Sequence, residues 1–209
     1  MDIFYDFDGT LFNTYPIMVA ALSSALSELG IKSNKEKLYF SMRQKSLGET
    51  IKNVAKMNKI DAKIIKKKYD EYEKLNIKKA TSFDDVKDTL EFVSNRKKGR
   101  NFLLTHRDEA ALSLLKSHGL SDYFTDAITG KSSFPRKPNP ASLNYLIKKN
   151  NVNLSNSYMV GDRNLDIDAA HNAHIKGILF DYDNLINVSS NPELKVNSFQ
   201  EIINYLAKI

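Results

Sequence analysis

The sequence predicts an α/β protein in which a doubly wound parallel sheet carries an inserted all-helical segment. Two observations predict this arrangement. After residue 82, short apolar runs alternate with segments whose apolar residues recur at helical spacing, and this alternation indicates parallel strands joined by right-handed crossovers. Before residue 82, about 65 residues show helical patterns with no strand-like run between them. We therefore expect a core domain formed by 1–13 and 82–209, and a helical domain formed by 14–81.

The first element is a buried strand at 2–6, which ends at the turn formed by Gly9 and Thr10. The helical segment begins with a helix from Pro16 to about residue 29. Pro16 suits the first turn of a helix, and Gly30 suits the position just after its end. The other helices expected in this segment lie at about 34–44, 48–57 and 61–78.

The remaining elements belong to the core domain. The run 81–84 can start a helix that extends to about Arg96. The later strands are expected at 101–105, 127–129, 158–161 and 177–181. The later helices are expected at 108–118, 140–149, 164–174 and 198–208. The stretch 182–197 is rich in Asn and Ser, so we expect an irregular surface loop there.

The composition is that of an ordinary globular protein, with 42% hydrophobic and 27% charged residues. The chain has no cysteine, which excludes disulfides, thiolate metal sites and thiol nucleophiles. No apolar run approaches the roughly 18 residues of a membrane helix. The first strand begins so early that it leaves no room for a signal peptide. We therefore expect a cytoplasmic protein with no membrane contact.

The net charge of +6 is unevenly distributed along the chain. Residues 13–82 hold 15 lysines and arginines against 7 acidic residues. The simplest interpretation of the run 66–68 is a solvated, lysine-rich helix surface. The alternative is an electropositive lid that attracts an anionic substrate. No RNA- or DNA-binding signature accompanies the lysines, so no nucleic-acid partner is expected.

Two acidic clusters lie where predicted strands end. Asp6 and Asp8 follow the first strand, and Asp162 and Asp166 follow the strand at 158–161. The carboxyl ends of parallel strands are where open α/β sheets bind ligands. Four carboxylates converging there would repel one another unless a cation neutralised them, and such hard oxygen ligands suit Mg²⁺. The pattern predicts a metal-dependent enzyme.

The first cluster also predicts phosphoryl-transfer chemistry. A carboxylate such as Asp6 can attack phosphorus to form an acyl phosphate, and Asp8 could protonate the departing oxygen and later activate water. Alone, Asp-x-Asp-Gly is a modest signal, because turn caps and calcium loops also use it. Two further residues follow in a fitting order. The hydroxyl of Thr105, at a strand end, could hold a phosphoryl oxygen, and the ammonium of Lys137, in a proline-stiffened loop, could neutralise phosphate and nucleophile together.

With these residues in this order, the chain resembles the haloacid dehalogenase superfamily of phosphatases. It is most similar to the branch with a helical cap after the first motif, which includes phosphoglycolate phosphatase and β-phosphoglucomutase. The resemblance covers the whole chain and implies a Rossmann-like core. It also implies that Asp6 is the nucleophile and a Mg²⁺ ligand. Asp8 would be the general acid and base, with its backbone carbonyl on the metal, and Thr105 and Lys137 would bind the phosphoryl group.

The resemblance assigns further roles. Asp162 would ligate Mg²⁺, with Asp166 nearby as a ligand or as a partner of the ligands. Arg107 could face the substrate, while His106 is expected to lie at the surface or to pack at the end of the sheet. The segment 42–50 resembles the specificity loop of the family around Gly48. Within this segment, the basic residues Arg43 and Lys45 are the candidates for reaching an acidic group on the substrate.

Two alternatives to a phosphatase stay open. A sugar phosphomutase would keep the same motifs, although Glu49 departs from the small and basic residues that follow the specificity glycine in such mutases. A non-catalytic phospho-ligand-binding protein would be expected to lack Asp6, Asp8 or Lys137, and all three are present. Haloacid dehalogenation is disfavoured because dehalogenating members of the superfamily have no carboxylate at the position of Asp8. We expect a small phosphorylated metabolite as substrate, and a monomer or weak dimer.

Overall fold

The computed structural model describes all 209 residues, which form two compact units. One unit combines Met1–Phe12 with Ser82–Ile209, and the other is Asn13–Thr81. The chain therefore leaves the first unit just after its first strand, forms the second unit, and returns.

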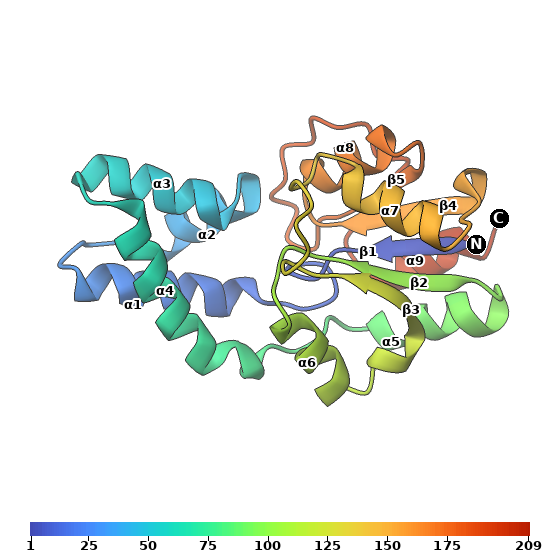
Figure 1. Cartoon of the computed structure of the whole chain (residues 1–209), viewed down its shortest axis with the longest axis horizontal. Helices are drawn as coiled ribbons and strands as arrows, with labels where there is room; N and C mark the ends of the chain where they lie inside the picture. The colour runs from blue at the N-terminus through green and yellow to red at the C-terminus, as the bar shows by residue number, and fades with distance from the viewer. The chain divides into compact units, whose positions relative to one another are not determined.

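The larger unit is built on a six-stranded parallel sheet with the strand order β3-β2-β1-β4-β5-β6 (Figure 1). Its strands are β1 (Asp2–Tyr5), β2 (Arg100–Leu104), β3 (Phe124–Ile128), β4 (Ser157–Gly161), β5 (Lys176–Phe180) and β6 (Leu194–Val196). The order runs outward from β1 to β3 and then restarts on the other side of β1 with β4. This reversal between β1 and β4 is the switch point at which doubly wound sheets bind ligands. The predicted doubly wound parallel sheet is confirmed.

Helices cover both faces of the sheet. On one face, α7 (Ala141–Lys149) and α8 (Asn164–Asn172) share an apolar cluster with Phe4, Phe102 and Met159 of the central strands. The opposite face meets α5 (Val86–Glu91) and α9 (Phe199–Leu206), which also pack on each other. Figure 1 shows α6 (Ala110–Ser117) on the same side of the sheet as α5. Three short helical turns complete this unit: η2 (Phe92–Arg96, a π-helix), η3 (Ser121–Tyr123) and η4 (Leu154–Asn156).

The strand β6 corrects the prediction that 182–197 is irregular throughout. Leu194–Val196 pairs in parallel with β5, with Leu194 opposite Ile178 and Val196 opposite Phe180. An edge strand of three residues is too short to show a periodicity of its own. Its central residue is a lysine, a residue type that keeps sheet edges from pairing with other chains.

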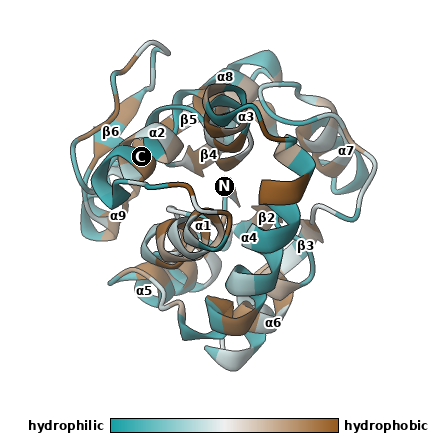
Figure 2. Ribbon diagram, turned by 90° about the vertical axis from the view of Figure 1, so that its left-hand side faces the viewer, coloured by the Kyte–Doolittle hydropathy of each residue, from teal (hydrophilic) through white to brown (hydrophobic).

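The smaller unit consists of helices around an apolar core of its own. Its helices are α1 (Tyr15–Glu28), α2 (Lys35–Gln44), α3 (Leu47–Asn58), α4 (Ala62–Asn76) and the short turn η1 (Ile77–Lys79). The core includes Leu22, Leu26, Met42, Ile51 and Ile65, each almost completely buried. Hydrophilic and hydrophobic residues alternate within individual helices (Figure 2), as they do in amphipathic helices.

Local sequence explains where the helices of the smaller unit start. The side chains of Asn34, Ser46 and Asp61 each accept a hydrogen bond from a backbone N–H in the first turn of the helix that follows. Such N-caps satisfy donors that the helix itself leaves without a partner. None of the helices in the chain combines the length and the apolar character needed to cross a membrane.

Asn101 of β2 ties the sheet to the helices on one face. It is fully buried, and its Oδ1 accepts a hydrogen bond from the Tyr5 hydroxyl at 3.2 Å. Its Nδ2 lies 3.1 Å from the carbonyl oxygen of Leu90 and 3.2 Å from that of Tyr123. One amide group thus joins β1, β2, α5 and the turn that precedes β3.

Replacing Asn101 with alanine should therefore destabilise the protein. Buried groups that lose their partners cost about 1–3 kcal/mol each, so we expect Asn101→Ala to lower the free energy of unfolding by about 2–4 kcal/mol. Urea denaturation followed by circular dichroism measures the change. The matched control is Asn95→Ala, at an exposed asparagine. A cost for Asn101→Ala no larger than that of the control would show that this network adds nothing to stability.

Candidate active site

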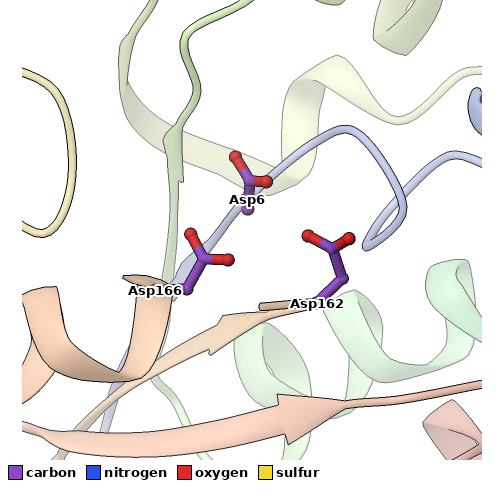
Figure 3. Close-up of side chains that lie close together, drawn as sticks. All are labelled: Asp6, Asp162 and Asp166. Carbon is purple, nitrogen blue, oxygen red and sulfur yellow. The ribbon is translucent and has the colours of Figure 1, made fainter. Parts of the chain in front are cut away.

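Three aspartates converge where β1 and β4 end. The carboxylate oxygens of Asp6, Asp162 and Asp166 lie within 4.8 Å of one another, and all three residues are buried (Figure 3). Asp6 follows β1 and Asp162 follows β4, which are neighbouring strands. The Asp6 N–H donates to the carbonyl oxygen of Val160 at 3.0 Å, which continues the pairing of the two strands by one residue. The register of the sheet therefore fixes the distance between the two predicted motifs.

Asp166 reaches the cluster from the first turn of α8 because Gly161 makes room for it. A Cβ atom at residue 161 would lie 2.2 Å from the Cβ of Asp166, closer than any real contact. The Asp166 carboxylate also accepts a hydrogen bond from the Arg163 N–H at 3.2 Å, which holds it at the start of the helix. The turn from β4 into α8 thus needs a glycine at its last strand position.

Lys137 supplies the positive charge that this cluster requires. Its Nζ lies 2.9 Å from Asp6 Oδ1 and also pairs with Asp166, and its side chain is 1% exposed. Burial alone would lower the pKa of Lys137, but the carboxylates of Asp166 and Asp6 raise it above its ordinary value. A buried ammonium is tolerated only when it is paired in this way. Lys137 is therefore charged and held between two members of the cluster.

The cluster nevertheless keeps an excess of negative charge. Three carboxylates face Lys137 and the more distant Arg163, whose Nε lies 3.6 Å from Asp162 Oδ1. Burial, helped by the charges of Asp166 and Asp162, raises the pKa of Asp6 to about 7 against the opposing charges of Lys137 and Arg163. A cation among these oxygens would relieve the repulsion. A set of carboxylate oxygens suits a hard divalent cation, so these three residues can hold a metal ion.

Asp8 lies outside the cluster, although it is only two residues from Asp6. Its Oδ1 is 2.8 Å from both Nε and Nη2 of Arg107. The Asp8 side chain is 21% exposed, whereas Asp6 is buried. The role expected for the backbone carbonyl of Asp8 on a metal stays a prediction. The two carboxylates of the first motif thus occupy different environments.

The three residues after β2 each make a defined contact. Thr105 is buried and its hydroxyl oxygen accepts a hydrogen bond from the Arg107 N–H at 3.0 Å. His106 Nε2 lies 3.1 Å from the backbone N of Lys137 and accepts its hydrogen bond. Burial, together with the positive charges of Lys137 and Arg136, lowers the pKa of His106 to about 4. A neutral imidazole with an unprotonated Nε2 is the form that this hydrogen bond requires.

The contact between His106 and Lys137 was not predicted. The sequence suggested that His106 lies at the surface or packs at the end of the sheet, whereas the structure shows that it anchors the loop that carries Lys137. The two residues lie 31 positions apart, and only their location in the segments that follow the neighbouring strands β2 and β3 could have suggested the contact.

The candidate residues of the helical unit lie near the junction of α2 and α3. Arg43 is completely buried, and its guanidinium carbon lies 5.3 Å from the centre of the Tyr15 ring. This is the geometry of a cation–π contact within the unit. Lys45 and Gly48 are exposed. A contact of these three residues with substrate stays a prediction.

Comparison with known proteins identifies the family of the chain. Residues 3–180 match the haloacid dehalogenase-like hydrolase family. The chain belongs to this family. The resemblance inferred from the four motifs is confirmed, and so is the prediction of a hydrolase.

Individual relatives match over nearly the whole length of the chain. It is 28% identical to a phosphoglycolate phosphatase of Vibrio parahaemolyticus, over 98% of this chain and 95% of the relative. A hydrolase from Streptococcus pneumoniae of known structure is 30% identical, with a TM-score of 0.67, over 99% of this chain and 97% of the other. A predicted phosphoglycolate phosphatase from Haemophilus somnus shares the fold, with a TM-score of 0.84 and 23% identity, over 98% of this chain and 96% of the other.

The low pKa of His106 predicts how stability depends on pH. Between pH 6.5 and 4 the unfolded chain binds a proton at this residue and the folded chain does not, so the free energy of unfolding falls as the pH is lowered. His106→Gln keeps a hydrogen-bond acceptor but does not titrate. Allowing for the partial exposure of His106, we expect the unmodified protein to lose about 1 kcal/mol more than this variant between pH 7 and pH 5.

Urea denaturation of both proteins at the two pH values measures this difference. Groups that titrate elsewhere in the chain affect both proteins alike and cancel in the comparison. Equal losses of stability would show that the fold does not keep His106 neutral.

Proposed function

We propose that this protein is a Mg²⁺-dependent phosphatase that acts on a small phosphorylated metabolite through an aspartyl-phosphate intermediate. The observation that carries the proposal is the buried carboxylate of Asp6, which lies 2.9 Å from the Lys137 ammonium and beside Asp162 and Asp166. The relatives named phosphoglycolate phosphatase support a phosphoric monoester as substrate. A phosphorylated small organic acid of that kind is the first compound to test.

In the first step of the proposed reaction, a carboxylate oxygen of Asp6 attacks the phosphorus atom of the ester. The bond between phosphorus and the ester oxygen breaks, and that oxygen takes a proton from Asp8. In the second step, a water molecule gives a proton to Asp8 while its oxygen attacks the phosphorus of the intermediate. The bond to Asp6 breaks, which releases inorganic phosphate and restores both side chains.

The surrounding residues stabilise the charge that moves during these steps. Lys137 already lies beside Asp6, where its ammonium can neutralise the phosphoryl group as it is transferred. Thr105, at the end of β2, can bind a phosphoryl oxygen. Asp6, Asp162 and Asp166 would hold Mg²⁺, which when bound offsets the negative charge of nucleophile and phosphoryl group. Preorganised charges of this kind need no rearrangement during the reaction.

The helical unit Asn13–Thr81 is part of the proposal. In the branch of the family that the chain resembles, such a unit is a cap that chooses the substrate. The exposed residues Lys45 and Gly48 at the junction of α2 and α3 are the candidates for this selection. Arg43 is the third candidate. Its guanidinium contacts the Tyr15 ring and would also bind the substrate.

The first test of the proposed function is replacement of the nucleophile. Asp6→Asn should lower turnover of p-nitrophenyl phosphate by at least about 10³-fold, because an amide cannot form the acyl phosphate. Removing divalent ions with EDTA should abolish turnover of the unmodified enzyme, and Mg²⁺ should restore it. Release of p-nitrophenol reports both effects.

The control for this test is Asp122→Asn, which makes the same chemical change at an exposed aspartate. Substantial turnover by Asp6→Asn, or undiminished turnover without divalent ions, would rule out the proposed mechanism. A panel of phosphorylated metabolites then separates the alternatives, because a phosphatase releases inorganic phosphate whereas a mutase returns an isomeric phosphate ester.

The second test concerns Lys137. Lys137→Ala leaves Asp6 and Asp166 without their ammonium partner and removes a charge that stabilises the transferring phosphoryl group. We expect kcat to fall by about 10²–10³-fold, the loss found when one preorganised donor is removed from an active site. Lys131→Ala, at an exposed lysine paired with Glu109 on the surface, is the matched control. Thermal melting with Mg²⁺ present shows whether each variant is folded.

If folded Lys137→Ala keeps its kcat while Asp6→Asn is inactive, another cation must stabilise the transferring phosphoryl group. That outcome would leave the nucleophile in place and remove Lys137 from the mechanism.

A further inference from the structure

Arg107 makes a contact that the proposed reaction has not yet used. Its guanidinium lies against Asp8, with Nε and Nη2 both 2.8 Å from Oδ1. The Arg107 side chain is only 7% exposed, so this ion pair is shielded from solvent on the arginine side. Asp8 and Arg107 follow β1 and β2, which are neighbouring strands.

We infer that Arg107 is a positioning residue that holds Asp8 in place for proton transfer. This inference rests on the proposed function, in which Asp8 donates and then accepts a proton. Both guanidinium contacts fall on Oδ1, so Oδ2 is left to exchange the proton. Two donors from one rigid, planar guanidinium also fix the position of Oδ1 more closely than a single flexible ammonium does.

The backbone of Arg107 is itself fixed at both ends. Its N–H donates to the Thr105 hydroxyl oxygen at 3.0 Å, and its carbonyl oxygen accepts a hydrogen bond from the Gly130 N–H at 2.7 Å. The arginine is thus held between the segment after β2 and the segment after β3. Asp8, in contrast, lies in a turn and is partly exposed, so its orientation depends on what holds the side chain.

The sequence suggested a different role, in which Arg107 faces the substrate. The two roles predict different kinetics. A residue that binds substrate raises KM and acts whether or not Asp8 is present. A residue that orients the general acid lowers the rate at which a poor leaving group departs, and has no such effect once Asp8 is gone.

The test compares an alkyl phosphate with an aryl phosphate. Departure of the strongly basic alkoxide of β-glycerophosphate needs a proton from Asp8, whereas p-nitrophenolate departs far more easily without one. The parameter kcat/KM reports the transfer of the phosphoryl group to Asp6 in each case. The proteins to compare are the unmodified enzyme, Asp8→Asn, Arg107→Met, Arg107→Lys and the double variant Asp8→Asn/Arg107→Met.

We expect Arg107→Met to lower kcat/KM for β-glycerophosphate by about tenfold to a hundredfold, the cost of misplacing a catalytic group. The loss for p-nitrophenyl phosphate should be at least about ten times smaller, and the loss for β-glycerophosphate should appear in kcat rather than in KM. Arg107→Lys, which keeps the charge but not the planar fork, should recover part of the loss. In the Asp8→Asn background, Arg107→Met should leave the ratio between the two substrates unchanged.

Arg96→Met is the control, because Arg96 is exposed and precedes β2 at the opposite end of the sheet.

Equal losses for both substrates, or a rise in KM that persists in the Asp8→Asn background, would overturn the inference and assign Arg107 to substrate binding. An Asp8→Asn variant with no preference between the substrates would instead refute the proposed role of Asp8. An unmodified enzyme that hydrolyses neither ester would refute the proposed function, and the inference would fall with it.

Discussion

The pairing of the Lys137 ammonium with Asp6 and Asp166 is the interaction on which the site depends. Three carboxylates cannot stay ionised within 4.8 Å of one another in a buried place without nearby positive charge. Lys137 can supply it only because the loop after β3 reaches the carboxyl ends of β1 and β4. His106 holds the backbone of that loop. The strand order brings the aspartates together, and the loop after β3 supplies the positive charge that balances them.

The first motif contains two carboxylates that the structure treats differently. Asp6 is buried beside an ammonium, and Asp8 is partly exposed beside a guanidinium. Each therefore has its own cation, delivered by a different segment: the loop after β3 for Asp6 and the residues after β2 for Asp8. Placing two similar groups in unlike environments is how a site can give them unlike roles. Two positions along the chain suffice for this division, because the pairing with β4 stops after Asp6 and the chain then turns at Gly9.

Much of the fold and part of the site could be predicted from the sequence. The runs that end in Asp6 and Asp162 predicted neighbouring strand ends, because an apolar run that stops at a carboxylate marks the edge of a buried sheet. The contacts between His106 and Lys137 and between Arg107 and Asp8 could not be predicted, since one sequence shows residue types and order but not which distant side chains meet. The strand β6 was missed because three residues carry no detectable periodicity.

The position of β1 between β2 and β4 also has a consequence for synthesis of the protein. The first strand leaves the ribosome before both of its neighbours, and β4 begins only at Ser157, after β2 and β3 have been made. Until then one edge of β1 has no neighbour, and its apolar residues are open to pairing with other nascent chains. The pairing of β4 with β1 closes that edge, and the same step brings Asp162 beside Asp6.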